Sequence, residues 1–115
     1  MESNLYPNNL ELNKDEVIQN FERAINHKNF TQLERAIFEL LFLALKTNNT
    51  PTLNKESLMD QLKSLNNEHY QVVFNWHQSI QQVTYGLNVA GTDHEHLIST
   101  SMHVRDIILT NYITS

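Results

Sequence analysis

The chain has 115 residues, no cysteine, 8 Lys and Arg residues against 13 Asp and Glu residues, and a formal net charge of −5. This length fits one domain with its own core, and the lack of cysteine excludes disulfides, thiolate catalysis and cysteine metal sites. The acidic balance and scattered basic residues disfavour a nucleic-acid-binding surface, and they favour simple solubility or a basic protein partner.

The N-terminal residues contain no basic segment followed by an apolar run, so we expect no signal peptide. The longest apolar run, residues 40–45, is too short to span a bilayer. We therefore expect a cytoplasmic protein that does not associate with a membrane.

Residues 1–12 contain Pro7 and two adjacent asparagines and show no sustained hydrophobic period, which predicts an extended N-terminal arm. A single helical-bundle domain is expected over residues 13–115. Its first helix should begin at Asn13, a good N-cap residue, because acidic residues follow in the first turn. Apolar residues at helical spacing continue this helix to about residues 27–29.

The second helix is expected to begin at Thr31, with Glu34 completing a capping box. From residue 33 to residue 45 apolar side chains occupy nearly the whole circumference. A helix of this kind is covered on nearly all sides, either at the centre of the bundle or against another copy of the chain. Within this run Glu39 is either a solvated edge residue or a buried carboxylate paired with an arginine.

Asn54 should cap a third helix after a loop at residues 47–54. A break at Asn66 and Asn67 precedes a fourth helix from Glu68 to about Tyr85. The apolar faces of these two helices are predicted to contain Leu58, Met59, Leu62 and Leu65, followed by Tyr70, Val73, Phe74, Ile80 and Val83.

Both glycines of the chain, Gly86 and Gly91, fall in one turn after the fourth helix. A fifth helix from Asp93 to about Tyr112 is expected to bury Leu97, Ile98, Met102 and Ile108. The prediction is an all-α fold, a compact bundle of about five helices with an extended N-terminal arm.

Three histidines, His94, His96 and His103, follow the glycine turn. On a regular helix the first two point about 200° apart, and the last two lie two turns, roughly 10 Å, from each other. Neither spacing lets one pair chelate an ion, so we expect no metal site.

The run Ser99 to Ser101 beside His103 lacks the strained turn and oxyanion donors that a serine nucleophile needs. These small residues favour close contact with another helix. We therefore expect no catalytic set and no cofactor.

The turn LNVAGTDHE, residues 87–95, stands between a long helix and a final helix rich in small and apolar residues. This arrangement resembles the HEPN family of bacterial defence modules, which are helical bundles, often dimeric, and in many cases RNases. The resemblance places Asn88 at the polar position of the family's catalytic motif and His94 at its histidine. Leu87 stands where the family has arginine. The resemblance implies the bundle, a homodimer and an RNA-binding or RNA-cleaving module.

The preferred hypothesis is a protein-binding inhibitor of the immunity or antitoxin kind, which neutralises a basic toxin, such as a nuclease, by occlusion. Its carboxylates would mimic phosphates, and its aromatic residues would act as anchors unless they pack in the core. The predicted partner-binding residues are Glu68, Tyr70, Trp76, Tyr85, Asp93 and Glu95. We expect a basic protein partner rather than direct contact with nucleic acid. The HEPN-like module is the alternative, and an oligomeric scaffold without a ligand is the third hypothesis.

Overall fold

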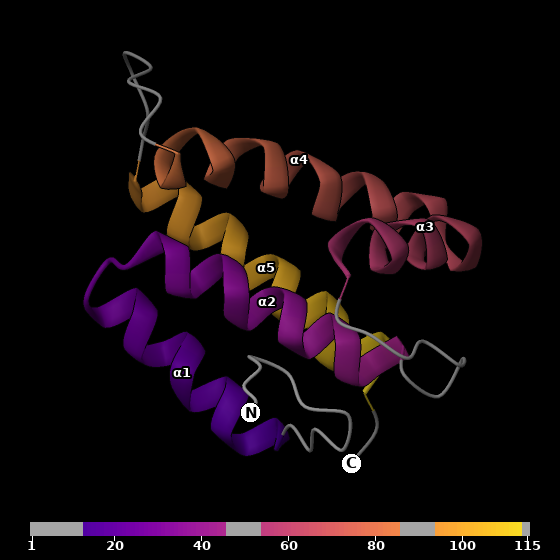
Figure 1. Cartoon of the computed structure of the whole chain (residues 1–115), viewed down its shortest axis with the longest axis horizontal. Helices are drawn as coiled ribbons and strands as arrows, with labels where there is room; N and C mark the ends of the chain where they lie inside the picture. The colour runs from indigo at the N-terminus through magenta and orange to yellow at the C-terminus, as the bar shows by residue number, and fades with distance from the viewer. Residues whose placement is uncertain (1–12, 46–53, 86–93, 114–115) are drawn as a thin grey trace, which may run out of the picture.

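A computed structural model describes residues 13–45, 54–85 and 94–113, and these residues form an all-α bundle (Figure 1). The predicted arm at residues 1–12 and the predicted glycine turn lie outside the described residues. Within them the helices are α1 (Lys14–Asn26), α2 (Phe30–Leu45), α3 (Lys55–Leu65), α4 (Asn67–Thr84) and α5 (His94–Asn111). The predicted all-α fold is confirmed.

Asparagine side chains define the starts of three helices. Asn13 Oδ1 accepts a hydrogen bond from the backbone N–H of Asp15 at 2.8 Å, as predicted. Asn54 and Asn66 cap α3 and α4 in the same way, each with an N–H donor 3.0 Å away. These side chains satisfy backbone donors that have no partner within the helix, which explains why the helices begin there.

The predicted start of α2 is wrong. The helix begins at Phe30, and Asn29 Oδ1 accepts from the backbone N–H of Gln32 at 3.2 Å. The predicted capping box does not form, because Glu34 is only 5% exposed and bonds to side chains of other helices. Asn29 is the cap instead of Thr31, and Phe30 directly after it is buried in the core.

The α1–α2 connection is a Schellman motif with Lys28 at the left-handed position, φ 52°. The Asn29 N–H donates to the Ala24 carbonyl at 2.8 Å, and the Lys28 N–H donates to the Ile25 carbonyl at 3.1 Å. These bonds satisfy the last carbonyls of α1 and reverse the chain sharply, so that α1 and α2 pack side by side (Figure 1).

α2 is the central helix, which was one of the two alternatives that its apolar circumference left open. It packs against each of the other four helices, and 12 of its 16 residues are buried. α5 runs antiparallel to α4, since Ser101 meets Trp76 while Tyr112, just beyond α5, meets His69 in the first turn of α4. The side chains with the largest volumes in the core are Trp76, Phe21 and Phe38.

Three residues assigned to buried faces are exposed instead: Leu65 (53%), Met102 (38%) and Phe74 (37%). Leu65 is the last residue of α3, which is a short helix at the end of the bundle. On α5 the buried stripe is Leu97, Ser101, Val104 and Ile108, so Ser101 occupies the core side and its neighbour Met102 faces outward. The burial of Leu97 and Ile108 was predicted correctly, and Met102 was the error.

Candidate functional site

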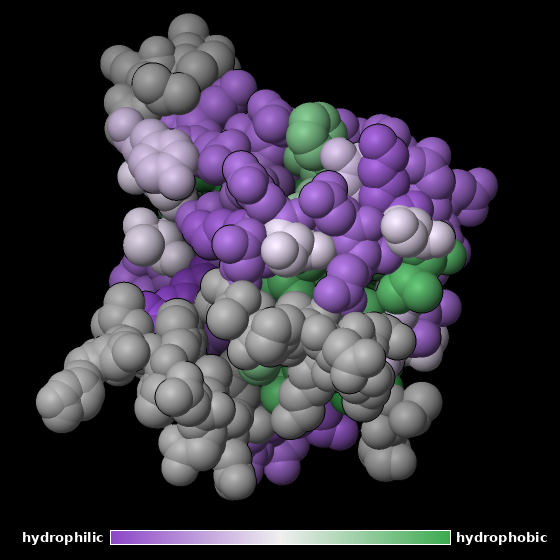
Figure 2. All heavy atoms as spheres, turned by 45° about the vertical axis from the view of Figure 1, so that its right-hand side comes forward, coloured by the Kyte–Doolittle hydropathy of each residue, from purple (hydrophilic) through white to green (hydrophobic). Residues whose placement is uncertain are grey.

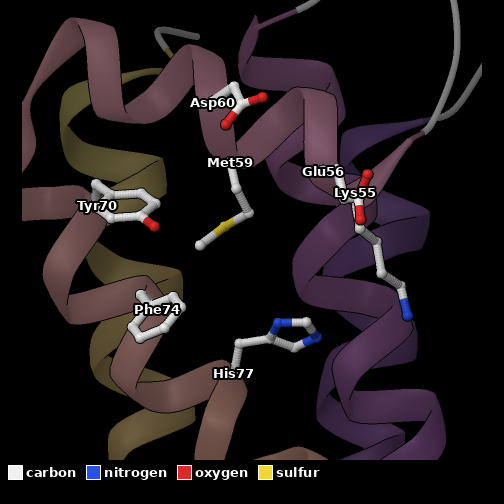
Figure 3. Close-up of a pocket in the computed structure, with 7 residues that line it drawn as sticks. All are labelled: Lys55, Glu56, Met59, Asp60, Tyr70, Phe74 and His77. Carbon is white, nitrogen blue, oxygen red and sulfur yellow. The ribbon is translucent and has the colours of Figure 1, made fainter.

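A pocket of about 300 Å³ lies between α3 and α4 (Figure 3). α3 contributes Lys55, Glu56, Met59 and Asp60, and α4 contributes Tyr70, Phe74 and His77. The spacing of three or four residues puts each set on one face of its helix. The short turn around Asn66 brings these two faces together, so the pocket follows from the α3–α4 hairpin.

A buried ionic cluster lies against the pocket and joins three helices. Glu34 Oε2 on α2 accepts a hydrogen bond from His77 Nε2 on α4 at 2.8 Å and from Lys55 Nζ on α3 at 3.2 Å. The Glu34 side chain is 6% exposed and the His77 side chain 14%. A buried charge of this kind persists only with such partners, which makes the cluster a strong constraint on how α2, α3 and α4 assemble.

Burial alone would raise the pKa of Glu34, but the hydrogen bond from His77 and the charge of Lys55 outweigh it and lower the pKa below its ordinary value of 4.5. Glu34 is therefore an ionised carboxylate at neutral pH and can only accept hydrogen bonds. His77 Nε2 must accordingly carry a proton, which it donates to Glu34. In Figure 3 the other ring nitrogen, Nδ1, faces the space below Met59.

Aromatic contacts hold the His77 ring in place. Its centroid lies 4.9 Å from that of Phe38, edge to face, and 5.9 Å from that of Trp76. Lys55 Nζ lies 5.4 Å from the Phe38 centroid as well as against Glu34. These contacts keep the Lys55 ammonium near α2, away from the middle of the pocket (Figure 3).

The opposite wall of the pocket is aromatic. The rings of Tyr70 and Phe74 stack at 5.7 Å with an interplanar angle of 28°, and the Tyr70 hydroxyl points toward the open middle (Figure 3). Lys63 Nζ lies 5.5 Å from the Tyr70 centroid. Glu56 and Asp60, both exposed, stand along the α3 edge. The site therefore combines apolar walls with carboxylates at its rim.

Among the predicted partner-binding residues, only Tyr70 lines this pocket. Glu68 is exposed in the first turn of α4, next to it along the chain. Tyr85, 65% exposed, and Glu95, also exposed, lie near the other end of α4, roughly 24 Å along its axis. Asp93 lies outside the described residues. The structure therefore divides the predicted set between two separate regions.

Trp76 is a core residue, which corrects its assignment as a partner-binding anchor. It is 0% exposed, and its Nε1–H donates to Ser101 Oγ at 2.7 Å. The Ser101 hydroxyl in turn donates to the Leu97 carbonyl at 2.8 Å. The small residues of α5 thus allow close contact with α4, as predicted, and Ser101 also provides an acceptor for the indole.

The catalytic positions implied by the HEPN resemblance are only partly within the described residues. Asn88 lies outside them, while His94 is exposed at the start of α5 with its ring 5.0 Å from the Phe30 ring. The guanidinium of Arg105 bonds to Asp106 at 2.9 Å and lies 5.0 Å from the Phe21 ring, and Arg23 bonds to Asn20. These contacts hold both arginines to neighbours other than His94.

A second, more polar hollow on α1 and α2 is lined by Asn20, Gln32, Arg35, Ala36 and Glu39. Glu39 is 7% exposed and accepts a hydrogen bond from Arg35 Nε at 3.2 Å. Of the two alternatives for this residue, the buried carboxylate paired with an arginine is therefore the correct one. Its partner is one turn away on the same helix, so this pair does not link helices.

Sequence reasoning missed Glu34, His77 and Lys55. The signal for Glu34 was present, since it interrupts the apolar circumference of α2 just as Glu39 does, but the capping-box spacing offered a competing explanation. His77 and Lys55 carried no comparable local signal, because their contacts with Glu34 span 43 and 21 residues of sequence.

Comparisons with protein families, with curated proteins and with solved structures found no match. Over residues 13–45, 54–85 and 94–113 no group of three metal-ligating side chains comes together. None of the helices in those ranges combines the length and the apolar character that a membrane crossing requires.

Proposed function

We propose that this chain is a small acidic cytoplasmic protein that binds a basic protein partner and occludes it, as immunity proteins and antitoxins do with nuclease toxins. The observation that carries the proposal is the α3–α4 pocket, where apolar walls and two exposed carboxylates occur together. An anchor residue in such a pocket gains free energy from desolvation, and the surrounding charges select and orient it.

The charge of the whole chain supports the same partner class. At a net charge of −5 the chain attracts a basic protein at long range and repels the phosphates of nucleic acid. Among the coloured residues of the face seen in Figure 2, which turns the right-hand side of Figure 1 forward, hydrophilic side chains predominate, with a few apolar ones between them. Such a surface fits a reversible complex between two folded proteins better than an obligate apolar interface.

Affinity purification from the native host and mass spectrometry would identify the partner. The decisive measurement uses the purified pair: a stoichiometric complex with a basic protein whose activity falls as this chain is added. A stoichiometric partner that is acidic, or one whose activity is unchanged in the complex, would refute inhibition by occlusion.

Asp60→Lys tests whether the pocket is the contact surface. We expect this substitution to increase the dissociation rate of the complex by at least about tenfold, because it replaces an attractive contact by a repulsive one. Glu22→Lys is the matched control: it changes the net charge equally but lies exposed on α1, away from the pocket. Surface plasmon resonance would measure both rates.

Glu68→Lys and Glu95→Lys change exposed charges at the two ends of α4. We expect both to lower mainly the association rate, and more strongly at low ionic strength, where screening is weak. If Asp60→Lys and Glu22→Lys change the dissociation rate equally, the pocket is not the contact surface.

The HEPN-like alternative, an RNA-binding or RNA-cleaving module, stays a prediction. The described residues add no contact in its favour, since His94 packs on Phe30 and the guanidinium of Arg105 is held by Asp106. RNA that co-purifies with the chain and is lost on His94→Ala would support this alternative against the inhibitor.

A further inference from the structure

The lining of the α3–α4 pocket contains several hydrogen-bond acceptors. Glu56 and Asp60 supply carboxylates, and the Tyr70 hydroxyl can accept. His77 Nε2 donates to Glu34 at 2.8 Å, so this donor is already used outside the pocket. The Lys55 ammonium, a donor, is held by the same carboxylate at 3.2 Å. A guest that matches this set must carry several donors.

The apolar walls of the pocket favour a side chain with a flat end. Phe74, 37% exposed, continues the flat face of the Tyr70 ring along α4, and the flexible thioether of Met59 lies opposite. Lys63 already places an ammonium over Tyr70 at 5.5 Å, which shows that this wall accepts a cation. A planar cation with an aliphatic stem could lie along Phe74 and reach the rim carboxylates.

We infer, building on the proposed function, that the α3–α4 pocket binds an arginine side chain of the basic partner. Arginine has five N–H donors and no acceptor, stays charged at all relevant pH values, and stacks on aromatic rings. Lysine fits less well, because its compact, strongly hydrated ammonium cannot stack or bind two carboxylates in one plane. A volume of about 300 Å³ accommodates one long side chain rather than a helix.

The role of the buried cluster follows from this assignment. Glu34 touches no guest, but its hydrogen bond with His77 Nε2 at 2.8 Å fixes the orientation of the ring at the pocket wall. It also draws the Lys55 ammonium toward α2, which removes a repulsive charge from the guanidinium's position. Glu34 is therefore a positioning residue for cation binding.

The experiment is a titration of the isotope-labelled full chain with N-acetyl-arginine amide, followed by amide chemical shifts in NMR spectra. N-acetyl-citrulline amide, which has the same shape but no charge, and N-acetyl-lysine amide are the comparison ligands. We expect the arginine compound to shift the amides of residues 56, 60, 70, 74 and 77, and to bind about tenfold more tightly than citrulline, because its hydrogen bonds are charge-assisted.

Two variants keep the result specific to the pocket. Asp60→Asn should weaken binding of the arginine compound several-fold, whereas Glu22→Gln, which removes an exposed charge on α1, should leave it unchanged. Equal binding of arginine and citrulline, or shifts spread equally around Glu22, would overturn the inference.

The outcome for the inference is separate from the outcome for the proposed function. If the pocket takes arginine and no basic protein partner is inhibited, the pocket assignment stands and the inhibitor role fails. If a partner is inhibited but the arginine compound leaves the pocket amides unshifted, occlusion stands and the arginine anchor is wrong.

Discussion

Glu34 is the buried carboxylate that connects α2 to two residues lining the pocket. It is 5% exposed, and one of its two carboxylate oxygens, Oε2, accepts hydrogen bonds from side chains of two other helices. Removing one partner from a buried hydrogen bond leaves the other without a full partner, which is more costly than the net contribution of the bond to stability. Glu34 therefore affects both the stability of the bundle and the orientation of His77.

The lowered pKa of Glu34 predicts a pH-dependent contribution to stability. Because the folded-state pKa lies below the ordinary value of 4.5, the contribution is present above that value and is lost as the pH falls through the folded pKa. Glu34→Gln should lower the free energy of unfolding at pH 7 by about 1–3 kcal/mol.

This deficit should shrink at pH 3, where protonation begins to weaken the wild-type cluster too. Urea unfolding at pH 7 and pH 3 measures the difference in free energy of unfolding between Glu34→Gln and the wild type. Glu22→Gln is the control at an exposed position. A deficit that is as large or larger at pH 3 would show that Glu34 is not ionised in the folded protein.

At the scale of elements, the short connections between helices determine the architecture. Asn66 ends α3 and caps α4, which makes the tight hairpin that forms the pocket. The α1–α2 connection, residues 27–29, is also short and places Lys28 at φ 52°, where a residue with a Cβ atom is strained. Both connections bring helices that are adjacent in the sequence into direct contact.

Lys28→Gly should stabilise the protein. Glycine adopts the left-handed conformation without the steric cost, and in this Schellman motif we expect a gain of about 0.5–1 kcal/mol in the free energy of unfolding. Lys28→Ala removes the same side chain but keeps the Cβ atom, so it should show no such gain. Thermal and urea unfolding of the two variants would separate the relief of backbone strain from the effect of removing the charge. An equal gain in the free energy of unfolding in both variants would contradict this explanation.

At the scale of the whole molecule, one core joins all five helices in the described residues. α2 packs against the other four, α5 closes the bundle against α2 and α4, and the Trp76–Ser101 hydrogen bond of 2.7 Å lies at the α4–α5 contact. A core shared in this way cannot lose one helix without exposing apolar side chains of its neighbours.

We therefore expect a single cooperative unfolding transition. Trp76 is the only tryptophan and is fully buried, so its fluorescence reports the core around α4 and α5, whereas far-ultraviolet circular dichroism reports all helices. The two signals should give the same urea midpoint and the same slope. Separate midpoints would show that α1 or α3 unfolds independently of the rest.

The sequence by itself determined the class of fold and the positions of the helices. Asparagine caps at Asn13 and Asn54 and the helical period of apolar residues are local signals, because a cap bonds to its own first turn and a period depends on neighbouring residues. The apolar circumference of α2 left two positions open, the centre of the bundle or a contact with another copy of the chain. The cap at Asn29 and the burial of Ser101 in place of Met102 were not predicted.

Tertiary structure alone decided which aromatic residues are exposed and where the pocket lies. Trp76 and Tyr85 have equally suitable side chains for a partner, yet one is fully buried and the other is 65% exposed. Glu34, Lys55 and His77 meet only because α2, α3 and α4 pack at one place. Periodicity shows which face of a helix is apolar, but it does not show which other helix packs against that face. Contacts between residues that are distant in the sequence depend on how the helices pair.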